Sequence, residues 1–133
     1  HTAGDHCLIQ IAKIICAKVQ YNADVIRYGG DEFLVFFHNT LPDFQDLIKN
    51  LYEAIVQEGI PHNHPHPHSS VTVSIGGLVV HDSNQSLDEL IAVVDHVLYQ
   101  VKKTGRNGFS IVSLNQSMQE VHHRYSSPVP PLL

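Results

Sequence analysis

The stretch "RYGGDEF" (Arg27–Phe33) lies between two apolar runs, Val25–Ile26 and Leu34–Phe37. Apolar, β-branched and aromatic residues on both sides of a glycine-containing loop are typical of a β-hairpin. This loop is unusual because two adjacent glycines are followed by two adjacent carboxylates. We therefore expect strands over about residues 24–28 and 33–37, joined by a turn that has a chemical role.

The rest of the sequence predicts helices alternating with strands. Apolar residues at helical spacing predict three helices, over about residues 5–19, 43–58 and 87–103. Short β-branched segments predict two further strands, over about residues 71–80 and 109–114. The order α-β-β-α-β-α-β implies a sheet with helices packed on it, so the expected fold class is α/β (α+β).

The predicted helices each have one apolar face and recognisable ends. Ser86 and Glu89 have the spacing of a capping box, and Gly59 and Gly105 follow the second and third helices as stop signals. We expect the residues of these apolar faces to be buried: Leu8, Ile11, Ala12, Ile15, Val19, Phe44, Leu47, Ile48, Leu51, Ile55, Leu87, Leu90, Ile91, Val94, Leu98 and Val101.

Two segments do not fit this pattern. Residues 62–68 alternate histidine with asparagine and proline, which suits a surface loop; capture of a transition metal by two or three of the imidazoles is the alternative. After Leu114 the sequence loses its periodicity and ends in prolines. We therefore expect residues 1–114 to form the domain and residues 115–133 to form a flexible Pro-rich tail.

The composition excludes several classes of protein. The 133 residues are 43% hydrophobic, which is enough for a packed core, and the formal charge of -5 argues against a nucleic-acid partner. No apolar run approaches the roughly 20 residues of a membrane span. Cys7 and Cys16 have no metal-binding spacing, so we expect buried free thiols and a cytoplasmic location.

The turn suits phosphate chemistry. Glycines allow backbone N–H groups to approach a phosphate, and the carboxylates of Asp31 and Glu32 can hold Mg²⁺ or accept a proton. Lys102 and Arg106 follow the third helix and could bind further phosphate oxygens. An ordinary Gly-rich hairpin with exposed acids remains the alternative.

Four motifs in this order resemble the GGDEF domain of the diguanylate cyclase family: "HTAGD", "RYGGDEF", "VTVSIGG" and "VDHVLYQVKKTGRNG". The resemblance covers about residues 1–114. It implies a nucleotidyl-cyclase palm-like central sheet on a βαββαβ core. It also implies condensation of two GTP molecules into cyclic di-GMP and two pyrophosphates by a homodimer with Mg²⁺ or Mn²⁺.

The resemblance also assigns roles to residues. Asp31 would bind the metal, and Glu32 would assist deprotonation of the 3′-hydroxyl or share a metal. The substrate-binding residues would be Asp5 for the guanine edge, Gly29 and Gly30 against the phosphates, and Lys102 and Arg106 for the β- and γ-phosphates.

The sequence departs from the family in two places. The family has a first strand with a metal-binding Asp before a Gly-His pair, and this sequence begins at His1 of that pair. We therefore expect residues 1–114 to lack the N-terminal strand of the domain, and residues 1–133 alone to fold only partly or to associate and to lack cyclase activity. The parent protein would carry an N-terminal sensor region, which could anchor it to the inner membrane. The family's inhibitory Arg-x-x-Asp has Tyr21 in place of Arg before Asp24, so we expect no product inhibition there.

Two other functions remain open. One is a catalytically inactive module that binds GTP or serves as a dimerising partner. The other, weaker, is a metal-responsive interaction domain that uses the His62–His68 loop.

Overall fold

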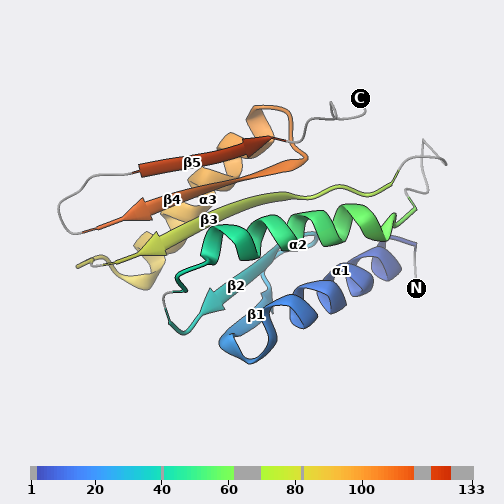
Figure 1. Ribbon diagram of the computed structural model, residues 1–133, viewed down its shortest axis with the longest axis horizontal. Coiled ribbons are helices and arrows are strands. Elements are labelled where there is room, and N and C mark those ends of the chain that lie inside the picture. Colours follow the sequence, from blue (N-terminus) through green and yellow to red (C-terminus); the bar gives the residue numbers. More distant parts are fainter. Residues whose placement is uncertain (1–2, 40, 62–69, 82, 116–120, 127–133) are drawn as a thin grey trace. The chain divides into compact units, whose positions relative to one another are not determined.

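The computed structural model describes residues 3–39, 41–61, 70–81, 83–115 and 121–126. The chain divides into two compact units, His1–Val71 and Thr72–Leu133. The first unit contains α1 (Ala3–Val19), a short 3-10 helix (Gln20–Asn22), β1 (Ala23–Arg27), β2 (Phe33–Phe37) and α2 (Phe44–Glu58). The second contains β3 (Ser74–Val80), α3 (Leu87–Lys103), β4 (Gly108–Leu114) and β5 (Val121–Ser126) (Figure 1).

The predicted hairpin is present in the first unit. β1 and β2 pair antiparallel, from Arg27 opposite Phe33 at the turn to Ala23 opposite Phe37 at the open end. α1 packs against α2 and contacts β1, and the two helices lie side by side in Figure 1. Their predicted apolar faces supply buried side chains, namely Ile11, Ile15, Val19, Ile48, Leu51 and Ile55.

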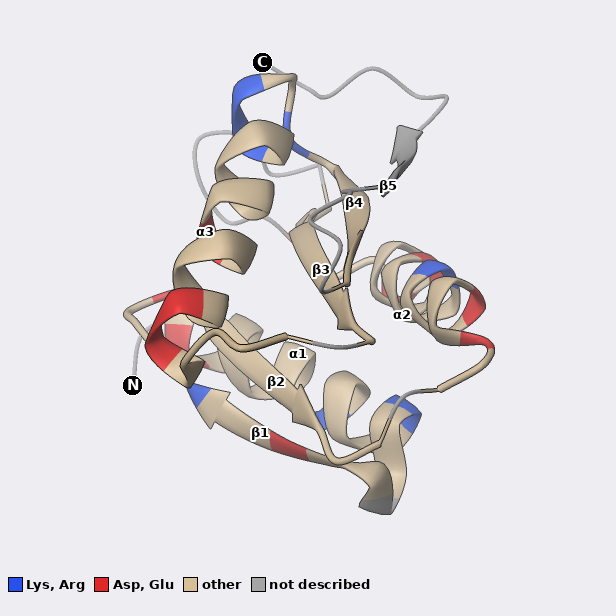
Figure 2. Ribbon diagram, turned by 90° about the vertical axis from the view of Figure 1, so that its left-hand side faces the viewer, with Lys and Arg blue, Asp and Glu red and all other residues tan. Residues whose placement is uncertain are grey.

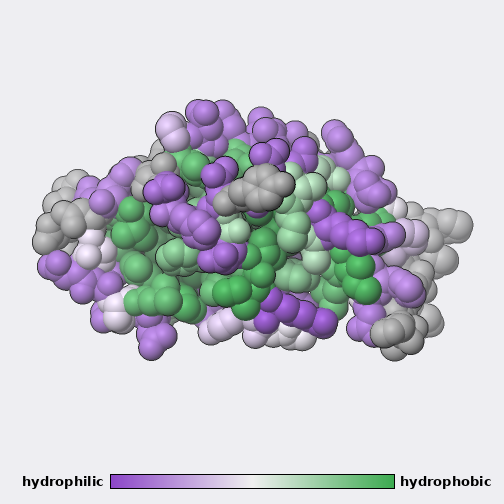
Figure 3. Space-filling view, turned by 90° about the horizontal axis from the view of Figure 1, so that it is seen from below, coloured by the Kyte–Doolittle hydropathy of each residue, from purple (hydrophilic) through white to green (hydrophobic). Residues whose placement is uncertain are grey.

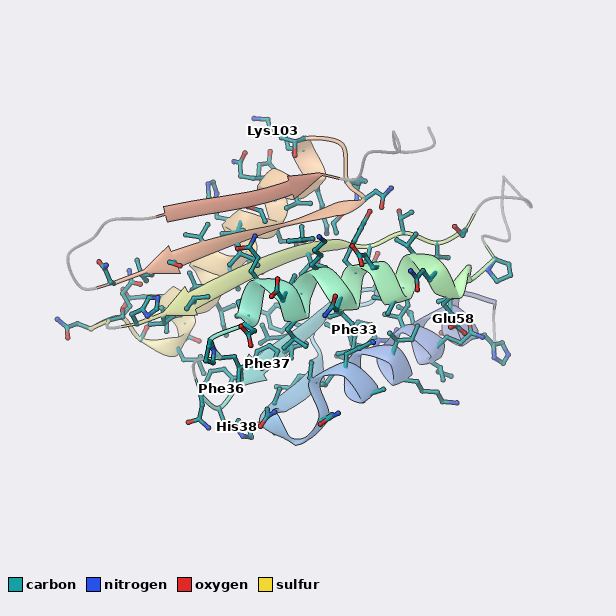
Figure 4. All side chains as sticks on the ribbon, in the orientation of Figure 1. Phe33, Phe36, Phe37, His38, Glu58 and Lys103 are labelled. Atoms are coloured by element: carbon teal, nitrogen blue, oxygen red, sulfur yellow. The ribbon has the colours of Figure 1, made fainter. Side chains whose placement is uncertain are left out.

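Aromatic contact and backbone geometry fix both ends of α2. The rings of Phe37 and Phe44 meet edge to face with centroids 5.4 Å apart, which ties the end of β2 to the start of the helix. Figure 4 shows Phe37 at this end of the hairpin. Gly59 ends α2 as predicted, with a left-handed φ of 62° and an N–H group that donates to the Val56 carbonyl.

The second unit is built on a β3–α3–β4 crossover. β3 and β4 pair in parallel, β5 pairs antiparallel with β4, and the strand order is β3-β4-β5. α3 contacts β3 and β4. The central strand β4 is buried along almost its whole length, including Phe109, Ile111 and Val112. A continuous apolar run is what a strand with two neighbours requires.

α3 has the predicted capping box. The Glu89 N–H group donates to the Ser86 hydroxyl at 3.2 Å, and the Ser86 N–H group donates to the Glu89 carboxylate at 3.4 Å. Acidic residues occupy the first turn and Lys102 and Lys103 the last turn, which matches the helix dipole (Figure 2). Leu87 is 55% exposed, so its predicted burial is wrong. It is the first residue of α3, whereas the buried residues of this helix, Val97 and Val101, lie in its second half.

Gly76 sets how closely α3 approaches β3. A Cβ atom at this position would lie 2.6 Å from the Leu98 backbone nitrogen and 2.9 Å from its Cα. Because backbone atoms cannot rotate away, any larger residue at position 76 would push α3 off the sheet. Gly76 therefore positions the helix whose last turn carries Lys102.

The α+β fold class is confirmed, with three helices and two small sheets among the described residues. The expected central sheet is divided there into the β1–β2 hairpin and the β3–β4–β5 sheet. The expectation that residues 115–133 lack regular structure is wrong for Val121–Ser126, because β5 covers the edge of β4 that would otherwise expose unpaired backbone groups. The His62–His68 loop lies outside the described residues.

Candidate active site

The turn of the hairpin is closed by its own backbone. The N–H groups of Tyr28 and Gly29 both donate to the Glu32 carbonyl, at 2.9 and 3.2 Å. The Arg27 guanidinium donates to the Gly30 carbonyl at 2.6 Å. The strands therefore hold the turn at both ends, and the hydrogen bonds from Tyr28 and Gly29 use the backbone carbonyl of Glu32 rather than its side chain.

Neither glycine of the turn is needed for conformation or packing. The left-handed glycines among the described residues are Gly59 and Gly105. Gly29 and Gly30 therefore have backbone φ angles that a residue with a side chain can also adopt. A Cβ atom at Gly30 would meet nothing within 4 Å, and one at Gly29 would make only an ordinary contact with Glu32, at 3.7 Å. The structure thus leaves open space over the Gly30 backbone, as the approach of a ligand to this turn would require.

The two carboxylates of the turn differ in their surroundings. Asp31 is exposed, and its side chain makes no hydrogen bond or ion pair within the described part of the chain. Glu32 is half-buried at the start of β2. Two adjacent carboxylates, one of them open to solvent, fit Mg²⁺, which takes one or two carboxylates and completes its shell with water and phosphate. No cluster of three or more metal-binding side chains occurs among the described residues.

The other predicted site residues lie at a helix end or in the loop that follows one. Asp5 is half-buried in the first turn of α1, where a carboxylate also favours the positive end of the helix dipole. Thr2, which has the spacing of a capping box with Asp5, lies outside the described residues. In the second unit, Lys102 is half-buried in the last turn of α3 and Arg106 is exposed in the loop that follows.

The hairpin also holds a side-chain hydrogen bond that the sequence did not predict. The Nε2 atom of His38 lies 3.0 Å from an Asp24 carboxylate oxygen, with both side chains exposed. Figure 4 shows His38 next to Phe37 at the end of β2. Asp24 and His38 flank the open end of the hairpin, and their pairing could be inferred only once its register was known.

One of the two thiols lies on the surface, where burial was expected. Cys16 is exposed, so the prediction of two buried thiols is wrong for it; Cys7 is half-buried, and burial raises the pKa of its thiol.

Ile26 and Phe36 on the hairpin are about half exposed. Figure 3 shows apolar and polar surface intermixed on the face that it draws. Within the described residues, no helix has the length and apolar character needed to span a bilayer.

Residues 1–108 match the family described as "Diguanylate cyclase, GGDEF domain". The chain is 32% identical over 123 residues to the bifunctional diguanylate cyclase/cyclic di-GMP phosphodiesterase MucR of Pseudomonas aeruginosa, covering 90% of this chain and 18% of that protein. It is 32% identical over 111 residues to the diguanylate cyclase DgcM of Escherichia coli K12, covering 80% of this chain and 25% of that protein.

A third relative is the diguanylate cyclase A of Treponema denticola, which is 28% identical over 116 residues, or 86% of this chain and 31% of that protein. The chain thus spans between about a fifth and a third of the length of these bacterial relatives. The family match covers the hairpin turn, both of its carboxylates and the end of α3. The chain therefore belongs to the GGDEF-domain family of diguanylate cyclases.

Proposed function

We propose that this domain, within its full-length protein, condenses two GTP molecules into cyclic di-GMP and two pyrophosphates. The observation that carries the proposal is the turn at Gly29–Glu32. Its glycines are required by neither backbone conformation nor packing, and an exposed carboxylate follows them directly. Space above a backbone and a carboxylate beside it are what a metal-bound triphosphate needs.

Asp31 and Glu32 would have different roles in the reaction. Phosphoryl transfer depends mostly on positioning the reacting groups and neutralising charge. Mg²⁺ or Mn²⁺ bound at Asp31 would neutralise the triphosphate and polarise the α-phosphate. Glu32 would accept the proton from the attacking 3′-hydroxyl or share a metal. The half-buried position of Glu32 suits a group that must hold a defined orientation.

The remaining residues would bind the two ends of the nucleotide. Asp5 would accept hydrogen bonds from the guanine amino and N1–H groups, which adenine cannot supply in the same pattern. Lys102 and Arg106 would hold the β- and γ-phosphates, where the arginine fork matches phosphate oxygens. Since each GTP attacks the other, the reaction needs two domains facing each other in a homodimer.

The second candidate function is an inactive domain that binds GTP or dimerises without turnover. The cyclase and an inactive GTP-binding domain would both require the open glycine turn for nucleotide binding, whereas a domain that only dimerises would not. Only the cyclase requires the proton-accepting role of Glu32. Nucleotide binding and turnover therefore have to be measured separately.

Gly30→Ala in the full-length protein is expected to weaken GTP binding without destabilising the fold. The methyl group enters open space in the free protein, so unfolding should change by less than about 1 kcal/mol. Against a bound phosphate the same methyl group should cost about 1–3 kcal/mol, or roughly five- to 150-fold in affinity. Calorimetric titration with GTP and urea unfolding measure the two effects.

Gly76→Ala is the matched control. Its methyl group would meet the Leu98 backbone, so this variant should lose about 1–3 kcal/mol of stability. Unchanged GTP affinity in a stable Gly30→Ala protein would contradict the placement of phosphate at the turn.

A further inference from the structure

The loop between α3 and β4 holds three consecutive residues in the left-handed region. Their φ angles are 124° at Gly105, 61° at Arg106 and 49° at Asn107. A helix end commonly uses one such residue, usually glycine, directly after its cap. Gly105 fills that position, and the Arg106 N–H group donates to the Val101 carbonyl at 3.0 Å to close the helix end. The end of α3 therefore does not require the left-handed conformations of Arg106 and Asn107.

Such a backbone is unfavourable for residues with a Cβ atom and persists where the surroundings fix it. Here both ends of the loop are fixed. The Thr104 N–H and hydroxyl groups donate to the Gln100 carbonyl at 3.0 and 2.9 Å. The Gly108 N–H group donates to the Val73 carbonyl at 3.2 Å, and Gly108 begins the pairing of β4 with β3. Only residues 105–107 remain to span the distance between these anchors.

We propose that Asn107 is a positioning residue whose left-handed backbone holds the Arg106 guanidinium in the orientation that binds the terminal phosphates of GTP. Arg106 is exposed and Asn107 is half-buried, so the loop presents the cation and keeps the residue after it against the fold. Asparagine tolerates the left-handed region better than most residues with a side chain. The inference rests on the proposed function, which assigns Arg106 to the phosphates.

Asn107→Gly and Asn107→Ala, made in the full-length protein, separate backbone from side chain. Both variants remove the amide, but only alanine makes a φ near 49° unfavourable. We expect the glycine variant to bind GTP within about threefold of wild type. We expect the alanine variant to bind up to tenfold more weakly than the glycine variant, because fewer molecules hold the competent loop. GMP, which lacks the terminal phosphates, should bind both variants equally.

Three outcomes would overturn the inference. Equal GTP affinity of the two variants, while wild type still prefers GTP to GMP, would show that the Asn107 backbone does not position Arg106 and would leave the proposed function intact. Equal weakening of GTP and GMP in the alanine variant would assign Asn107 a merely structural role. If wild type itself binds GTP and GMP alike, the phosphate-binding role of Arg106 fails, and the inference fails with it.

Discussion

Glu32→Gln in the full-length protein is expected to lower the rate of cyclic di-GMP formation by about 10²–10⁴-fold while GTP binding is retained. Glutamine keeps the shape of the side chain and removes the charge that accepts a proton or binds a metal. The turn should survive, because its hydrogen bonds from Tyr28 and Gly29 use the backbone carbonyl of residue 32. Initial rates and the GTP dissociation constant, measured on the same preparation, test this expectation.

Glu58→Gln provides a matched control for that variant. Glu58 is exposed at the last residue of α2 (Figure 4), where loss of a negative charge is neutral or slightly favourable for the helix dipole. Its turnover should equal that of wild type. If Glu32→Gln keeps a rate within about a factor of ten of wild type, Glu32 is not the acid–base group.

Asp31→Asn is expected to reduce turnover by about a hundredfold or more and to raise the Mg²⁺ concentration needed for half-maximal rate. Loss of a partner that merely supports a metal ligand already costs about 10–100-fold, and Asp31 is proposed as a direct ligand. Because the Asp31 side chain makes no hydrogen bond or ion pair among the described residues, its replacement should leave the thermal midpoint unchanged.

Asp24→Asn removes the same charge from the other end of the hairpin and is the control for this prediction. It breaks the exposed pair with His38, which is worth about 0–1 kcal/mol. The Mg²⁺ dependence should match that of wild type. If the two Asn variants show the same shift in Mg²⁺ requirement, the effect of Asp31 is general electrostatics and the metal-ligand role is wrong.

Local signals in the sequence predicted much of the fold. The hairpin around residues 28–32, the capping box at Ser86 and the left-handed stop at Gly59 each depend on residues close together in the chain. Features that depend on distant residues were missed. β5 forms on the edge of β4, and the exposure of Cys16 depends on which side of α1 is covered.

In the candidate site, too, the features that depend on neighbouring residues were predicted and those that depend on distant residues were not. Residue types and spacing were enough to identify the turn and its carboxylates. They could not show that Gly30 has open space whereas Gly76 lies against the Leu98 backbone, since both appear in the sequence simply as glycine. Arginine gives no local signal for a left-handed conformation, so the strained run at Arg106 and Asn107 appears only in the folded chain.

The identity of the product made from GTP tests the proposed cyclase activity most directly. The full-length protein is incubated with GTP and Mg²⁺, the nucleotides are separated, and pyrophosphate is measured in the same samples. We expect cyclic di-GMP, with two pyrophosphates released for each cyclic dinucleotide. Release of GDP or GMP without any cyclic dinucleotide, or no consumption of GTP at all, would contradict the proposed activity.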